Sequence, residues 1–179
     1  TGATNTAVGN IALGSNTTGG NNTAVGHNSL SANTTGSSNA ALGNAALSGN
    51  TTGSNNFGIG GFSFQYLTTG SNNMAIGTTA GREPAGGTNL DQRSVIDTFT
   101  TFIGYQAGRL GKNVASTTVL TNGIAIGKNA RIDSSNSAIL GGTGTDSINA
   151  SVGSTSPKAR LAVHALYEDT FASNLFMVA

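Results

Sequence analysis

The chain has 179 residues, of which 8% are charged, 27 are glycine, 2 are proline and none is cysteine or tryptophan, and its net charge is +1. The near-zero net charge provides no electrostatic footprint for nucleic acid or for an anionic membrane surface, and no run of about 20 apolar residues is available to span a bilayer. Composition therefore predicts neither a nucleic-acid partner nor membrane insertion. A glycine-rich polar chain suggests disorder when its apolar residues are aperiodic, but here they recur at fixed intervals.

Residues 1–81 repeat every 17 residues. A marker glycine ends a short apolar triplet in each copy: Ala7-Val8-Gly9, Ala24-Val25-Gly26, Ala41-Leu42-Gly43, Gly58-Ile59-Gly60 and Ala75-Ile76-Gly77. Asn-Thr-Thr-Gly, or Leu-Thr-Thr-Gly in the last case, occupies 16–19, 33–36, 50–53 and 67–70. A fixed period of this length predicts a solenoid of stacked coils. Its stacked turns, with ladders of Asn and Thr, explain why no charged residue precedes Arg82, since like charges in adjacent coils would repel.

Each copy is predicted to contain two short extended stretches and two turns. In the first stretch, alternation places the residue before the marker glycine on one face and the residue before that on the other. The residue before the glycine is branched and apolar in every copy, which predicts that it forms the core column. This predicted core column comprises Val8, Val25, Leu42, Ile59, Ile76, Ile103, Ile126 and Leu140.

The predicted fold class is therefore all-β, a parallel β-roll or β-solenoid with coils of about 17 and later about 14 residues. A small residue three positions after the marker glycine, as at Ala12 and Ser29, predicts close backbone approach. A coil this thin buries little apolar surface, so we expect it to associate in closed symmetry.

A recurring phrase identifies a family resemblance. Asn-x-Ala-[Val/Ile]-Gly-x-x-[Ala/Ser], seen at 5–12, 22–29, 73–80 and, with Leu42, at 39–46, resembles the head repeat of trimeric autotransporter adhesins and the matching repeat of bacteriophage tail fibres and tailspikes. The copies at 123–130 and 136–141 have marker glycines 14 residues apart, the step of that family. The resemblance covers roughly residues 1–153. It implies a left-handed parallel β-roll, a homotrimer, and an extracellular location on a virion tail fibre or a bacterial cell surface.

The second half of the chain is less regular. The step lengthens to 27 residues between Gly77 and Gly104 and to 23 between Gly104 and Gly127. Insertions in solenoids form loops, often on the binding face. The charged residues of these insertions are candidates for binding a host cell-surface glycan or protein: Arg82, Glu83, Asp91, Arg93, Asp97, Arg109 and Lys112. The competing interpretation is that they brace the roll, with charges paired between subunits.

Three regions follow from this pattern. Residues 1–81 form the regular roll, 82–153 an irregular roll with two inserted loops, and 154–179 a linker and the start of a further C-terminal segment. The phrase Thr155-Ser156-Pro157 through Val163 resembles a linker that often ends the shaft of phage tail fibres. It favours the phage fibre over the bacterial adhesin.

No reactive constellation is evident. Two histidines and seven acidic residues are too few and too scattered, which predicts no catalytic residue, cofactor or metal, and a protein that is not an enzyme. His27 is interpreted as a solvated or stacked turn residue. Phe62, Phe64 and Tyr66 are interpreted as a thickened core, with a sugar-stacking platform as the alternative.

The leading functional hypothesis is a structural and adhesive segment of a bacteriophage tail fibre that presents or contributes host-cell binding. The head of a bacterial trimeric surface adhesin is the alternative. An ice-binding solenoid that uses threonine arrays is a weaker one, because glycine and asparagine beside Thr17 and Thr18 disfavour a flat face.

Overall fold

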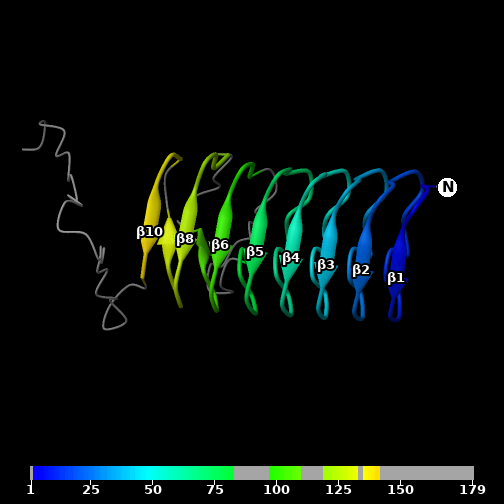
Figure 1. The fold of residues 1–179 in the computed structure, drawn as a ribbon, viewed down its shortest axis with the longest axis horizontal. Helices are drawn as coiled ribbons and strands as arrows, with labels where there is room; N and C mark the ends of the chain where they lie inside the picture. Colours follow the sequence, from blue (N-terminus) through cyan, green and yellow to red (C-terminus); the bar gives the residue numbers. More distant parts are fainter. Residues whose placement is uncertain (1, 83–96, 110–118, 133–134, 142–179) are drawn as a thin grey trace, which may run out of the picture. The chain divides into compact units, whose positions relative to one another are not determined.

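The computed structural model describes residues 2–82, 97–109, 119–132 and 135–141 (Figure 1). All of them belong to one of two compact units, Thr1–Ile148; the other unit, Asn149–Ala179, lies outside the described residues. Within the first unit, eight short strands stack side by side in one parallel sheet (Figure 1). The predicted all-β solenoid is confirmed.

The main sheet has the order β1-β2-β3-β4-β5-β6-β8-β10. Its strands are β1 (Thr6–Val8), β2 (Thr23–Val25), β3 (Ala40–Leu42), β4 (Phe57–Ile59), β5 (Met74–Ile76), β6 (Thr101–Ile103), β8 (Ile124–Ile126) and β10 (Ala138–Leu140). A second parallel pair joins β7 (Gly108–Arg109) to β9 (Arg131–Ile132). Equivalent residues pair throughout, and the register continues across the long steps, where Met74 lies opposite Thr101 and Thr101 opposite Ile124.

The marker glycine turns the chain at the end of each strand of the main sheet. In the coil of β3, Gly43 has φ +135°, a conformation that side chains rarely allow, and an added Cβ would lie 2.7 Å from the carbonyl carbon and oxygen of Gly60 in the next coil. The small residue three positions later sits inside the turn, where the Ala46 N–H donates to the Gly43 carbonyl at 3.3 Å. Ala46 is fully buried, which confirms the predicted close backbone approach.

The wall opposite the main sheet is not the second extended stretch that the sequence predicts. In the five 17-residue-spaced coils it consists of turns, with positive φ at Leu13, Leu30, Leu47, Phe64 and Gly81. These turns still stack through backbone hydrogen bonds, as from the Leu30 N–H to the Ala46 carbonyl at 3.0 Å. The second wall becomes extended only in the coils of β7 and β9, among the described residues.

The predicted core column is wrong by one residue. Val8, Leu42 and Leu140 are 57%, 50% and 57% exposed, and Val25, Ile59, Ile76, Ile103 and Ile126 are only partly buried. The middle residue of the strand points inward instead: Ala24, Ala41, Ala75 and Ala125 are at most 2% exposed. The physical reason is space, because Leu30, Leu47 and Phe64 from the opposite wall already fill the thin interior and leave room only for a methyl group.

Side-chain volumes compensate along this interior. In the coil that carries Phe64, the middle residue of the strand is Gly58. A Cβ added to Gly58 would lie 3.1 Å from Leu47 of the preceding coil and 3.1 Å from Ser63. Further along, Gly81 leaves space that the Phe64 ring occupies, since a Cβ on Gly81 would lie 2.3 Å from that ring. Phe102 then replaces the mid-strand alanine and packs on Phe64 with ring centroids 5.7 Å apart. The two rings fill the core at the transition to the irregular coils.

Two asparagine ladders hold adjacent coils together. The Oδ1 of Asn39 accepts the backbone N–H of Asn56 in the next coil at 2.9 Å, and its Nδ2 donates to the Gly53 carbonyl at 2.8 Å. The same pattern begins at Asn5 and continues through Asn22, Asn39, Asn56 and Asn73. This explains the asparagine that opens the repeated phrase.

The second ladder confirms the predicted stacking of the Asn-Thr-Thr-Gly turns. Asn33 donates to Asn16 at 2.8 Å and Asn50 to Asn33 at 2.9 Å. It stops at Leu67, so the Oδ1 of Asn50 is buried without a hydrogen-bond partner. Within the ladder, the Oδ1 atoms of Asn16 and Asn33 each accept from the asparagine of the next coil, which is why a buried polar ladder is tolerated there.

Candidate functional site

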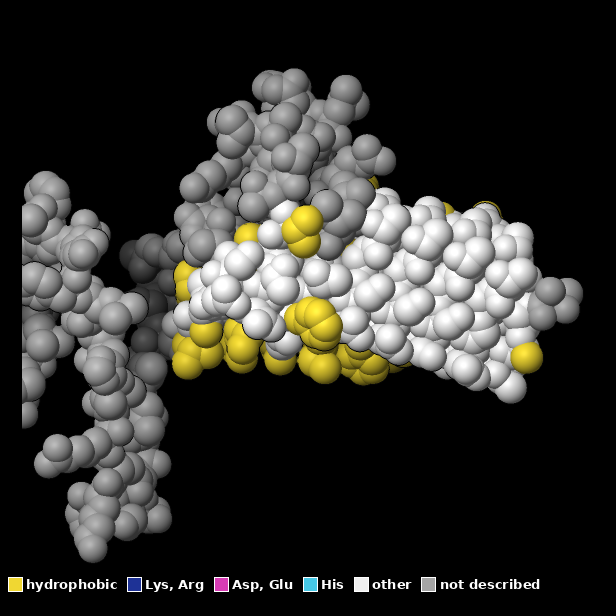
Figure 2. Space-filling model, turned by 90° about the horizontal axis from the view of Figure 1, so that it is seen from above, with side chains coloured by type: hydrophobic (Ala, Val, Ile, Leu, Met, Phe, Trp, Pro, Cys, Tyr) yellow, Lys and Arg dark blue, Asp and Glu magenta, His cyan; other side chains and the backbone are white. Residues whose placement is uncertain are grey.

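The outward face of the main sheet carries two columns of side chains that run from coil to coil, and we call it the strand face. One column is the row of aliphatic residues from Val8 to Leu140 defined above. The other comprises Thr6, Thr23, Ala40, Phe57, Met74, Thr101, Ile124 and Ala138. No charged residue occurs in either column. Figure 2 shows hydrophobic side chains gathered in a row along one border of the described part of the molecule.

The strand face becomes more apolar along the chain. The column that starts at Thr6 has threonine in its first two strands and later includes Phe57, Met74 and Ile124. Met74 is 38% and Ile124 is 39% exposed. Sequence reasoning missed this face because it assigned the larger aliphatic residues to the interior. In the first three coils the mid-strand residue is always alanine, and the opposite wall always carries a leucine. This constant pairing could have indicated that the alanine, and not the larger aliphatic residue beside it, points inward.

The charged residues predicted to form binding loops lie in different environments in the structure. Asp97 is fully buried and its Oδ1 accepts the Leu120 N–H at 2.9 Å, so its assignment to a surface loop is wrong. That carboxylate accepts a backbone N–H of the next coil, as the amide oxygen of Asn39 does in the asparagine ladder. Arg109 lies in β7, where only its backbone is described. Glu83, Asp91, Arg93 and Lys112 lie outside the described residues.

Arg82 belongs to an aromatic corner after β4 and β5. Its guanidinium carbon lies 5.4 Å from the ring centroid of Phe62 and 5.7 Å from that of Tyr66. Its Nε is buried without a hydrogen-bond partner, and so is the Oε1 of Gln65 in the preceding coil. The thickened-core interpretation is confirmed for Phe64, which is fully buried, but it is wrong for Phe62, which is 36% exposed.

The described residues offer little reactive chemistry. They contain no group of three or more His, Cys, Asp or Glu side chains arranged to hold a metal ion. His27 is exposed on its turn, with Nδ1 3.4 Å from Nδ2 of Asn44 one coil along, as predicted for a stacked turn residue. Within the same ranges, no helix has the length and hydrophobicity needed to cross a membrane.

Comparison of this chain with family models, curated proteins and solved structures gives no match. The strand face and the aromatic corner therefore carry the functional argument by themselves.

Proposed function

We propose that this chain is a structural and adhesive segment of an extracellular fibre, that of a bacteriophage tail, and that it assembles as a homotrimer through its strand face. The supporting observation is a row of aliphatic side chains, one in each of the eight strands of the main sheet, that are exposed or only partly buried.

The size of the strand face is that of an ordinary large apolar patch on a single chain. Seven strand-to-strand steps of about 4.8 Å give a length of about 34 Å, and three extended residues give a width of about 10 Å. The resulting footprint of about 340 Å² lies within the range of about 300–600 Å² for the largest apolar patches of monomeric proteins, which often mark interaction sites.

The regular spacing of the face points to a second copy as its occupant. Side chains of one type recur with every coil, so the face has a period set by the backbone hydrogen bonds. A globular partner has no feature that repeats at this interval over eight coils. Another copy that lies parallel has the same period and keeps its side chains in register along the whole length. The uncharged columns avoid repulsion between identical copies, and the resemblance to trimeric fibre repeats supplies the number three.

If the chain were instead the head of a bacterial trimeric adhesin, it would associate through the same strand face. The linker phrase at 155–163, which lies outside the described residues, favours the phage fibre. The ice-binding alternative gains no support from the threonine array. The hydroxyls of Thr17, Thr34 and Thr51 donate to the carbonyls of Thr34, Thr51 and Thr68 in the next coil, which ties them to the stack.

Light scattering coupled to size exclusion tests the assembly. The wild-type chain is expected to have the mass of a trimer. The double variant Leu42→Glu/Ile59→Glu places charges on the strand face and is expected to be monomeric, with the strand content unchanged by circular dichroism. Thr35→Glu, which adds a charge at an exposed turn residue, is the matched control and is expected to remain trimeric. A monomeric wild-type chain, or a double variant that still forms trimers, would contradict the proposed assembly.

A further inference from the structure

Equivalent positions in the different coils show which types of residue the fold accepts at each place. Phe62 occupies the second position after a marker glycine, where other coils carry Ile11, Asn28, Ala45, Thr79, Gln106 and Asn129. Its φ is +60°, a left-handed conformation that asparagine adopts more readily than phenylalanine. An exposed aromatic residue here costs backbone strain and apolar exposure. The fold does not require an aromatic residue, because four other coils form the same turn with Asn, Thr or Gln.

Arg82 is oriented by rings and by nothing else in the described part of the chain. Both Phe62 and Tyr66 lie within cation–π distance of its guanidinium, while no ion pair or side-chain hydrogen bond links Arg82 to the described residues. Only its Nε, among its three nitrogens, is buried without a partner. The terminal nitrogens are therefore not fully buried, and their fork suits a carboxylate.

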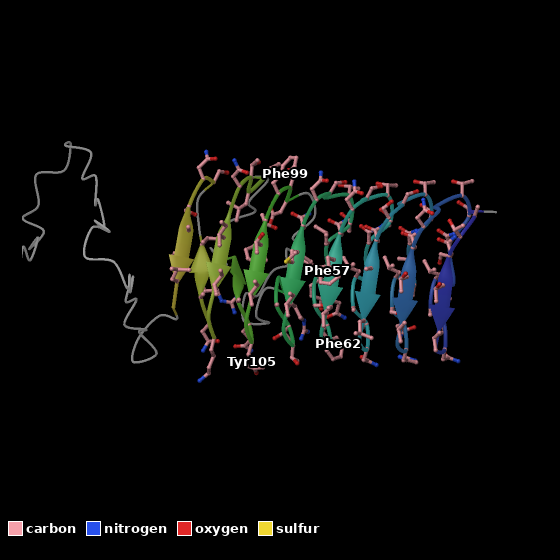
Figure 3. All side chains as sticks on the ribbon, in the orientation of Figure 1. Phe57, Phe62, Phe99 and Tyr105 are labelled. Atoms are coloured by element: carbon pink, nitrogen blue, oxygen red, sulfur yellow. The ribbon has the colours of Figure 1, made fainter. Side chains whose placement is uncertain are left out.

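A third aromatic residue lies on the same edge of the solenoid. Tyr105 follows the marker glycine Gly104 and is 49% exposed, where other coils have Asn10, His27, Asn44 and Thr78. Figure 3 shows Phe62 and Tyr105 on the edge that carries the turns after the strands, with Phe99 on the opposite edge. Phe62, Arg82 and Tyr105 lie two, five and one residues after the marker glycines that follow β4, β5 and β6. The guanidinium of Arg82 reaches back to Phe62, and the coils of Phe62 and Tyr105 are two steps apart along the axis, about 9.6 Å. We call this set the row Phe62–Arg82–Tyr105.

We propose that the row Phe62–Arg82–Tyr105, with Tyr66 supporting the guanidinium, binds an acidic polysaccharide built from uronic acids. This inference rests on the proposed adhesive function and names its ligand class. A uronic acid combines an apolar ring face, which stacks on an aromatic side chain, with a carboxylate on the same ring, which fits an arginine fork beside that side chain. A polymer of such rings that runs parallel to the solenoid axis contacts Phe62 and Arg82 with one sugar and Tyr105 with a following one.

The test uses titration calorimetry of the full chain with polygalacturonate, and with its methyl ester as the uncharged comparison. Each variant takes a residue that the same position has in another coil, which preserves the fold: Phe62→Asn as at Asn28, Arg82→Gln as at Gln65, and Tyr105→Asn as at Asn44. Phe99→Asn is the matched control, because Phe99 is 57% exposed on the opposite edge and its equivalents are Asn72 and Asn122.

The wild-type chain is expected to bind polygalacturonate and to bind the methyl ester at least about tenfold more weakly, since the ester removes the charge-assisted hydrogen bonds. Arg82→Gln is expected to lose about tenfold in affinity, and Phe62→Asn and Tyr105→Asn about threefold to tenfold each. Phe99→Asn is expected to bind as the wild type does.

Three results would overturn the inference: no binding of polygalacturonate by the wild-type chain, equal binding of the ester, or unchanged affinity in both Arg82→Gln and Phe62→Asn. The mass of each variant in solution separates this failure from that of the proposed function. A chain that forms trimers but does not bind polygalacturonate refutes the acidic ligand alone, whereas a monomeric chain contradicts the fibre assembly.

Discussion

Gly43 provides a direct test of the stacking geometry. We expect Gly43→Ala to destabilise the solenoid strongly, for two reasons that the structure separates. The φ of +135° is rarely adopted by residues with a side chain, at a cost of about 1–3 kcal/mol. The added Cβ also lies 2.7 Å from the carbonyl carbon and oxygen of Gly60 and 3.1 Å from the nitrogen of Gly61.

These contacts cannot be relieved by a rotating side chain, because they are all backbone. The N–H of Gly60 donates to the Leu42 carbonyl at 2.8 Å, so moving the next coil away weakens the hydrogen bonds between coils, each with a net contribution of about 1 kcal/mol. The two effects together predict a loss of about 3–5 kcal/mol. With a urea m-value of about 2 kcal/mol/M, the unfolding midpoint falls by about 1.5–2.5 M.

Urea unfolding followed by circular dichroism measures this shift. Gly61→Ala is the matched control in the adjacent coil, since the nearest atom to its added Cβ is 4.0 Å away and its φ is outside the left-handed region. This control is expected to unfold within about 1 kcal/mol of the wild type, on the stable side, because alanine restricts the unfolded chain. If Gly43→Ala unfolds at the same urea concentration as Gly61→Ala, the reasoning about the stack is wrong.

Three further predictions concern the interior. Asn39→Ala leaves the buried Asn56 N–H without its acceptor and removes one of the two side-chain donors to the Gly53 carbonyl, the other being Asn50. Thermal unfolding should therefore show a loss of about 1–3 kcal/mol, against less than about 0.5 kcal/mol for the exposed Asn44→Ala; equal losses would contradict the ladder. Ala41→Leu should lower the thermal midpoint by an amount equivalent to about 1–3 kcal/mol, since Ala41 points into a filled core, and an unchanged midpoint would restore the predicted core column. Gly81→Ala should cost at least about 1 kcal/mol less in a Phe64→Leu background than in the wild type, because its Cβ meets the Phe64 ring; additive losses in the double-mutant cycle would refute the volume compensation.

Much of the architecture could be predicted from the sequence because it is a local, repeated property. The 17-residue period fixes the coil length, the marker glycine fixes the turn, and the Asn-Thr-Thr-Gly segments fix the turn ladders. Each of these depends on residues within one copy and on the identical copy above it. The 14-residue step near the end, from Gly127 to Gly141, pairs β8 with β10 in the predicted register.

The candidate site could not be predicted in the same way. Alternation assigns Ala41 and Leu42 to opposite faces, but both are apolar, so the pattern does not tell which of them points inward. Leu47, only a few residues along the chain, decides this by filling the interior from the opposite wall. Likewise, Phe62, Phe64 and Tyr66 are one cluster in the sequence, yet only Phe64 is in the core.

The sequence by itself determined that residues 1–81 are a stack of uncharged, hydrogen-bonded coils, because periodicity and turn chemistry act between near neighbours in each repeat. Only the tertiary structure decided which side of each strand is the outside, because this depends on volume shared between two walls of the same coil. That decision moves the aliphatic column from the core to the surface. These aliphatic side chains therefore belong to the face that we propose for association instead of to the core. Asp97, which the sequence predicts to lie on the surface, is buried in the stack.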